Sequence, residues 1–188
     1  MLKVGQRRLT PDDWAAAALD AIARGGVAAV AVESIAAELG ATKGSFYWHF
    51  RSRDALIEAA LERWEKLRTE AFIDVFETEP DPAQRVKMII RGGLELPVDR
   101  AEIALLAHPD HPAALRAVRR VAERRISYIA DQLMKLGWSR REARDRAVHL
   151  YFLYVGHLQT THVIPELVDA PARRRALKLV FDGFVARR

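Results

Sequence analysis

Residues 32–53 contain two short helical patterns separated by a glycine. In the first pattern the apolar residues recur at helical spacing and share one face: Val32, Ile35, Ala36 and Leu39. Gly40 follows, and glycine readily adopts the left-handed conformation that ends many helices. Thr42 is a suitable N-cap for a second helix, because its hydroxyl can accept a hydrogen bond from a backbone N–H one turn further on. The segment therefore predicts a helix, a tight turn and a second helix.

The second helix carries a large aromatic residue on the side opposite its core. At about 100° per residue, Phe46 and Phe50 point one way, whereas Gly44 and Trp48 project from the other side. A tryptophan turned away from its own core needs an outside partner, and a neighbouring glycine lets the helix backbone approach that partner. The first residues of a recognition helix contact base edges in DNA. The pattern thus favours a DNA-binding helix-turn-helix, although an isolated exposed aromatic or a contact with another domain would give the same spacing.

Residues 42–56, TKGSFYWHFRSRDAL, resemble the recognition helix and the following linker of the TetR family of bacterial transcription regulators. The resemblance is specific over about the first 60 residues, where the motif lies in the expected context of helix, turn, helix and helix. Beyond Trp64 it extends only to length, helical texture and the order of elements. It implies an N-terminal DNA-binding domain followed by a helical domain that binds a small molecule and dimerises.

The resemblance also implies roles for individual residues. Lys43 and Ser45 would face base edges or nearby phosphates, and Tyr47 would donate its hydroxyl to a phosphate. Trp48 would lie against a sugar or a thymine methyl group. Contacts with the DNA backbone are implied for three further residues: Thr42, His49 and Arg53, the last standing where the family commonly has a lysine. The expected DNA-binding set is Thr42, Lys43, Gly44, Ser45, Tyr47, Trp48, His49 and Arg53.

Two positions depart from the family pattern. The helix before the turn usually opens with Ser or Thr, but Ala31 stands there, which weakens helix entry by about 1 kcal/mol. Glu33 lies near a position where some members have a base-reading arginine. A carboxylate can only accept, for example from a cytosine amino group, or be repelled by phosphate. The base preference therefore cannot be transferred from a relative.

Composition narrows the range of functions. The 188 residues include no cysteine, which excludes disulfides, a thiolate nucleophile and sulfur-ligated metal. No apolar run approaches the roughly 18 residues of a membrane span, and the start lacks a signal-peptide core, so we expect a cytoplasmic protein. The net charge is +5, yet residues 1–55 hold seven Lys and Arg against six Asp and Glu. The excess lies in arginine-rich helices further on, which are expected to be solvated faces.

The remainder reads as helices separated by proline and glycine. A long helix is expected from Ser52 to about Phe76, with one apolar face: Ile57, Ala60, Leu61, Trp64, Leu67, Ala71 and Val75. The last two long helices, 140–162 and 171–185, are rich in apolar residues. They are expected either to meet a second copy of the chain or to form the core of a monomeric bundle. The predicted fold is all-α with about nine helices, divided into a helix-turn-helix domain at 1–55 and a ligand-binding and dimerisation domain at 56–188.

Five polarisable residues of the second domain are candidates for an effector pocket, although residues of these types more often belong to the ordinary core: Trp64, Met88, Tyr128, His149 and Phe152. We expect no cofactor, no metal and no catalytic residue. His108 and His111 flank a turn and lack the third ligand that zinc needs. No phosphate-binding loop, nucleophile elbow or carboxylate pair occurs.

The sequence accordingly predicts a homodimeric repressor that binds a palindromic operator and is released by a small molecule. The alternatives are a helical enzyme or small-molecule carrier, and a DNA-binding regulator that senses no ligand. The first would show no salt-dependent affinity for duplex DNA, whereas a regulator would lose affinity steeply with salt. The second would be released by no metabolite.

Overall fold

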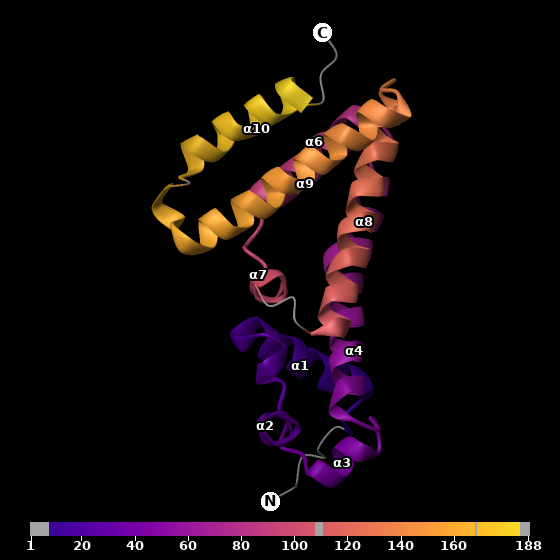
Figure 1. The fold of residues 1–188 in the computed structure, drawn as a ribbon, viewed down its shortest axis with the longest axis vertical. Helices are drawn as coiled ribbons and strands as arrows, with labels where there is room; N and C mark the ends of the chain where they lie inside the picture. Colours follow the sequence, from indigo (N-terminus) through magenta and orange to yellow (C-terminus); the bar gives the residue numbers. More distant parts are fainter. Residues whose placement is uncertain (1–7, 108–110, 168, 185–188) are drawn as a thin grey trace, which may run out of the picture. The chain divides into compact units, whose positions relative to one another are not determined.

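The computed structural model describes residues 8–107, 111–167 and 169–184, and within these ranges the regular structure is helical, with no strand (Figure 1). This confirms the predicted all-α class. The helices form two compact units. One comprises the residues up to Glu65 together with Arg100–Ala117, and the other comprises Lys66–Asp99 together with the residues from Val118 onward. Lys3 and Arg7 of the basic N-terminal tail, and His108, lie outside the described residues.

The first unit contains α1 (Pro11–Gly25), α2 (Val32–Glu38), α3 (Lys43–Tyr47), α4 (Arg53–Glu65) and α7 (Arg100–Ala107). A capping box opens α1, because Thr10 Oγ1 accepts from the Asp13 N–H and the Asp13 carboxylate accepts from the Thr10 N–H. Gly26 ends the helix with φ of 68°, a conformation that favours glycine.

An aromatic cluster forms the centre of this unit. Trp14 of α1 and Phe46 of α3 are fully buried and pack edge to face, with ring centroids 5.5 Å apart. Phe50 stacks on Phe46 at 5.7 Å. α1 also packs against α4 and α7. Because Phe46 is held inside, the opposite face of the short α3 is turned outward.

The long helix expected from Ser52 to Phe76 is interrupted by a π-helical turn, Lys66–Glu70, between α4 and α5 (Ala71–Glu77). The expected buried face is correct up to Trp64 and wrong beyond it, since Leu67, Ala71 and Val75 are exposed. Thr69 and Ile73 are buried instead. A π turn holds one residue more than an α turn, so the next buried residue after Trp64 comes five residues later, at Thr69, instead of three or four, and Ile73 follows one α-helical turn further on.

The second unit contains α5, α6 (Pro82–Glu95), most of α8 (Pro112–Lys135), α9 (Arg140–Val163) and α10 (Ala170–Phe184). Its helix ends follow the chemistry of their caps, such as the capping box between Ser139 and Glu142 at the start of α9. Gly137, with φ of 89°, separates α8 from α9. The core is aliphatic and comes from α6, α8 and α9: Val86, Ile90, Ile126, Ile129, Leu133, Ala143, Ala147 and Leu150.

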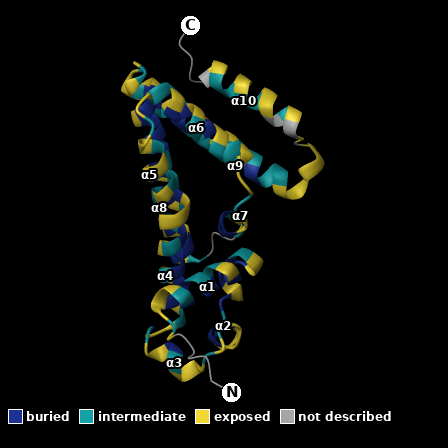
Figure 2. Ribbon diagram, turned by 180° about the vertical axis from the view of Figure 1, so that it is seen from behind, coloured by how far each residue is buried: buried dark blue, intermediate teal, exposed yellow. Residues whose placement is uncertain are grey.

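The end of α9, the segment after it and α10 expose large apolar side chains. Figure 2 shows exposed residues along much of α10. On α9, Leu158 is buried whereas Phe152 is 64% exposed. Leu177, Val180 and Phe181 of α10 pack partly against the core. The exposed apolar side chains, here called the α9–α10 face, are Phe152, Leu153, Val163, Ile164, Leu167 and Leu179.

Among the described helices, none is both long enough and apolar enough to span a bilayer.

Candidate nucleic-acid interface

The turn between α2 and α3 is built as its residues predict. α2 begins at Ala31 without a side-chain cap. Gly40 takes φ of 62°, and the Ala41 N–H donates to the Ala36 carbonyl at 2.8 Å, which closes the end of the helix. Thr42 Oγ1 accepts from the Ser45 N–H at 3.2 Å and so caps α3. The cap fixes the direction in which the first residues of α3 leave the turn.

α3 separates a buried side from an exposed one. Phe46 is fully buried, whereas Tyr47 is 56% exposed and Trp48, which caps the C-terminus of α3, is 84% exposed. Tyr47 leans against Phe46 edge to face, with ring centroids 5.0 Å apart, so its ring is supported while its outer part meets solvent. An indole exposed to this degree buries almost none of its apolar surface in the unit. This is the arrangement that an aromatic contact with an external partner requires.

The side chains next to these aromatics leave space for a close approach. Thr42, Lys43 and Gly44 are exposed, and Ser45 and His49 are half-buried. A Cβ placed on Gly44 would meet only Thr42 Oγ1, at 3.7 Å, which is ordinary van der Waals contact. The fold itself therefore does not require glycine at this position, where glycine is a poor helix former. Because glycine has no side chain, an approaching molecule can come close to the helix backbone at Gly44, and this accounts for the glycine.

Lys43 and Glu33 form an exposed ion pair across the turn. Lys43 Nζ lies 2.5 Å from Glu33 Oε1, and the two side chains are 56% and 66% exposed. The hydrogen bond from Lys43 is the main reason that the pKa of Glu33 lies below its usual range, and the same bond raises the pKa of Lys43. Glu33 was noted in the sequence as a departure from the family pattern, but its partner was not foreseen.

Arg53 is held by the backbone. Its Nε donates to the Val30 carbonyl at 2.6 Å, and its Nη2 donates to the Val27 carbonyl at 2.7 Å. The guanidinium thereby joins the start of α4 to the connection between α1 and α2. The structure brings Arg53 to these carbonyls rather than onto the surface of α3, and its expected contact with phosphate stays a prediction.

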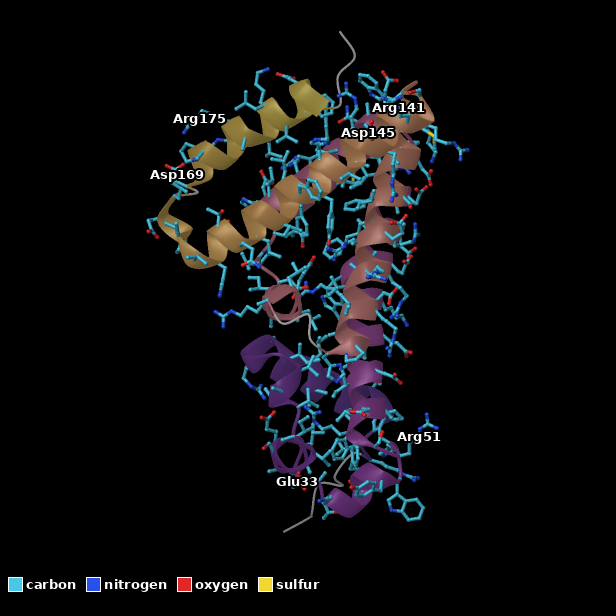
Figure 3. All side chains as sticks on the ribbon, viewed as in Figure 1. Glu33, Arg51, Arg141, Asp145, Asp169 and Arg175 are labelled. Carbon is cyan, nitrogen blue, oxygen red and sulfur yellow. The ribbon has the colours of Figure 1, made fainter. Side chains whose placement is uncertain are left out.

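Arg51 is a cation that the sequence argument counted but did not assign to the interface. It is exposed in the segment between α3 and α4, and it makes no hydrogen bond or ion pair with any residue that the structure describes. Figure 3 labels it together with Glu33, which lies on α2. Its position directly after the second predicted helix was the available signal.

Two arginines of the helices further on form ion pairs with acidic partners. Arg124 pairs with Glu70 at 3.0 Å, and Arg144 pairs with Glu123 at 2.9 Å. The Arg144 hydrogen bond lowers the pKa of Glu123. These pairs join neighbouring helices of the second unit, as expected of solvated faces and unlike a second nucleic-acid surface.

The five candidate pocket residues do not converge in the part of the chain that is described. Trp64 is buried in α4 of the first unit, and Met88 is half-buried on α6. His149 and Phe152 lie on the exposed side of α9, with ring centroids 6.3 Å apart. Tyr128 is buried on α8 and donates its hydroxyl hydrogen to Glu77 Oε1 at 2.8 Å.

Tyr128 also lines an open cavity of about 660 Å³ in the second unit. The walls combine apolar side chains with both signs of charge. They are formed by Ile73, Glu77, Arg124, Tyr128, Asp131, Gln132, Met134 and Lys135. Such a lining suits a small ligand that has polar as well as apolar parts.

The helix-turn-helix region of the chain is similar to a known protein family. Residues 15–60 match the family model described as "Bacterial regulatory proteins, tetR family". A search of curated proteins gives no match.

Solved structures match over nearly the whole chain. A putative transcriptional regulator from Saccharomonospora viridis, solved in complex with choline, is 21% identical with a TM-score of 0.79, and the match covers 95% of this chain and 98% of that one. E. coli NemR in its reduced form is 19% identical with a TM-score of 0.78, covering 94% and 97%. A transcriptional regulator from Rhodococcus sp. Rha1 is 21% identical with a TM-score of 0.76, covering 96% and 100%. At these identities the likeness shows a shared fold.

Proposed function

We propose that the chain is a member of the tetR family of bacterial regulatory proteins, whose model residues 15–60 match, and that it is a homodimeric repressor that leaves a palindromic operator when a small molecule binds. In this proposal residues 1–55 contact DNA, and residues 56–188 bind the effector and dimerise. The protein works in the cytoplasm and catalyses no reaction.

One observation carries the DNA-binding part of the proposal. Trp48 is 84% exposed at the end of α3, while its neighbour Phe46 is fully buried. The helix thus sends its largest side chain out of the protein, beside a glycine that no intramolecular contact requires. A DNA groove supplies the missing surface for the indole, and phosphates supply acceptors for the Tyr47 hydroxyl and for the exposed cations.

The remaining contacts follow from position. Lys43 and Ser45, in the first turn of α3, are proposed to face base edges. Thr42 and His49 are proposed to contact the DNA backbone, and Arg51 joins them as an exposed cation. Arg53 retains a proposed phosphate contact, which would use the N–H groups of Nη1 and Nη2 that do not donate to the Val30 and Val27 carbonyls.

Dimerisation is proposed through the α9–α10 face. This face exposes several leucine, isoleucine, valine and phenylalanine side chains. Apolar residues scattered singly over a surface need no partner, but a group of them indicates an interaction site. Two copies joined there would present two α3 helices, and a two-fold axis makes the preferred DNA site a palindrome.

The effector is proposed to be a small molecule bound beside Tyr128 in the second unit. Tyr128 supports this best, since it lines a cavity with charged and apolar walls. The complex of the S. viridis regulator with choline shows that a protein of this fold can be solved with a small molecule. Release from DNA requires only that the effector bind the DNA-incompetent arrangement more tightly.

Selection of binding sites from random duplex DNA tests the proposal. We expect a palindromic consensus and an affinity that falls steeply with salt, by about 0.9 logarithmic units per phosphate contact for each tenfold rise in salt. Screening small polar compounds for release of the selected DNA then tests the effector. Salt-independent or undetectable DNA binding would favour a helical carrier or enzyme, and binding that no compound releases would favour a regulator without a ligand.

Changing Trp48 and Tyr47 tests the proposed DNA-contacting face. Trp48→Ala removes an aromatic anchor from both half-sites, at about 2 kcal/mol each, so operator affinity should fall by about 1000-fold. Tyr47→Phe should also weaken binding strongly, since it deletes a phosphate donor. Affinity is measured by fluorescence anisotropy, and folding by circular dichroism. Leu115→Ala, at an exposed apolar residue of α8, is the control. Unchanged binding in both variants would remove this face from the interface.

A further inference from the structure

Glu33 places a carboxylate on the surface that the proposed function presents to DNA. It is the second residue of α2, and Lys43 is the first residue of α3, so their ion pair joins the two helices of the helix-turn-helix on the outside. Both side chains are more than half exposed. An exposed ion pair of this kind contributes little to stability. The fold alone therefore gives little reason for an acid at this position.

The charge state of the pair is fixed by its geometry. The ammonium group of Lys43 donates to Glu33 and lowers the pKa of that carboxyl, so Glu33 is ionised at neutral pH and can only accept hydrogen bonds. Lys43 keeps its proton and can only donate. Beside phosphates a lone carboxylate would be repelled. The pair is compatible with DNA only where the carboxylate oxygen finds a donor, and in the major groove such donors are the amino groups of bases.

A C·G base pair offers the complementary arrangement. Its major-groove edge presents the cytosine N4 amino donor next to the guanine O6 and N7 acceptors. An oxygen and an ammonium nitrogen held 2.5 Å apart match this neighbouring donor and acceptor. We propose that Glu33 and Lys43 act as one unit that recognises a C·G pair in each half-site, with Glu33 accepting from cytosine N4 and Lys43 donating to guanine. This inference rests on the proposed DNA-binding function.

An A·T pair is a poorer match for the same two groups. Adenine N6 would satisfy the carboxylate, but the two acceptors of the pair, adenine N7 and thymine O4, lie on opposite sides of that amino group, so the ammonium group would reach only one of them. Guanine instead offers two acceptors to an ammonium group that has three donors. The preference for C·G follows from this difference.

The test compares the base preferences of three proteins by selection from random DNA. The wild type should select C·G at one symmetric position of each half-site, and Glu33→Ala should lose the preference at that position alone. Glu38→Ala is the matched control: Glu38 lies on the same helix and forms an exposed ion pair with Arg24 at 2.7 Å. It removes the same charge and the same kind of contact, and should keep the wild-type preference.

Removing one amino group from the DNA tests the proposed contact between Glu33 and cytosine N4 directly. Replacing the selected cytosine by 2-pyrimidinone, which lacks the N4 amino group, should weaken wild-type binding by about 5- to 100-fold for a base contact of this kind. The Glu33→Ala protein should bind both DNAs equally. An A·T preference, an unchanged consensus for Glu33→Ala, or equal wild-type affinity for both DNAs would overturn the assignment while leaving the repressor intact. Failure of the wild type to select any DNA would instead overturn the proposed function itself.

Discussion

Two roles are possible for Arg53, a contact with DNA phosphate and a structural contact within the protein, and its hydrogen bonds allow the two to be tested separately. The family resemblance implies a phosphate contact, whereas the structure has Nε and Nη2 donating to the carbonyls of Val30 and Val27. Hydrogen bonds from a charged donor are worth about 1.5–3 kcal/mol. An arginine that ties α4 to the preceding connection therefore contributes to folding whether or not it also meets DNA.

Arg53→Met is expected to lower the free energy of unfolding by about 1.5–3 kcal/mol, because two carbonyls lose their charged donor. Urea denaturation measures this. Arg51→Met is the matched variant, since Arg51 is exposed and makes no polar contact with the described residues. It should change stability by less than about 0.5 kcal/mol while reducing the salt dependence of operator binding by about 0.9 per lost phosphate contact.

The opposite pattern would reassign both arginines. If Arg53→Met kept wild-type stability and lost only DNA affinity, Arg53 would be a phosphate contact and the two carbonyl bonds would be incidental. If Arg51→Met left the salt dependence unchanged, Arg51 would lie outside the interface.

The sequence predicted features that depend on neighbouring residues, but it did not predict contacts between residues that are distant in the sequence. Helical spacing was sufficient to turn Trp48 away from Phe46, because both positions lie within two turns of one helix. The ion pair of Glu33 with Lys43, and the bonds of Arg53 to residues more than 20 positions earlier, depend on how separate helices pack. The exposure of Trp48 was thus predictable, but the partners of Glu33 and Arg53 were not.

At the scale of helices, the boundaries were largely predictable because local chemistry sets them. Thr10, Ser139 and Asp81 accept from backbone N–H groups at helix starts, and Gly40 and Gly137 follow helix ends with positive φ. The π turn at Lys66–Glu70 was not predictable from periodicity. Arg125 stabilises it from α8, donating to Thr69 Oγ1 at 3.1 Å and to the Arg68 carbonyl at 3.0 Å. A partner about 55 residues away leaves no local signal.

Polar side chains join α8 to α5 and α6, and one of them, Tyr128, predicts that the stability of the second unit depends on pH. Tyr128 of α8 donates to Glu77 of α5, and Arg85 of α6 donates to Gln132 of α8 at 2.8 Å. Burial is the main reason that the pKa of Tyr128 is raised well above its usual range, and the hydrogen bond to Glu77 adds to the effect. The phenol therefore stays protonated in the folded chain at pH values where an unfolded chain has already lost that proton.

The sign of the expected effect follows from that difference. The stability that Tyr128 contributes is complete below the unfolded pKa of about 10 and is lost as the pH rises above it. The free energy of unfolding of the wild type, measured with urea between pH 8 and 11, should thus fall towards that of Tyr128→Phe. A constant difference between the two proteins across this range would show that the phenol ionises alike in both states.

At the scale of the whole molecule, the proposed operator binding depends on two α3 helices acting together. One α3 covers few base pairs, and two on a symmetry axis reach half-sites about 34–36 Å apart. The second helix then binds as an intramolecular event at high effective concentration. In the proposed function dimerisation is therefore a condition for tight binding, and the α9–α10 face exposes six large apolar side chains that could form the interface.

Phe152→Glu tests this link between assembly and DNA affinity. Phe152 is 64% exposed, so a charge there should leave the monomer folded. In a symmetric dimer the change introduces a carboxylate twice, and the loss of an aromatic anchor costs about 2 kcal/mol or more, which weakens dimerisation by at least about 30-fold. Analytical ultracentrifugation should show monomers, and operator binding should weaken while a single half-site is bound as weakly as by wild type.

Val75→Glu, at an exposed apolar residue of α5, is the control and should remain dimeric. A dimer that persists in Phe152→Glu with normal operator affinity would place the interface elsewhere, because a buried carboxylate pair at a two-fold contact could not be accommodated without a measurable loss.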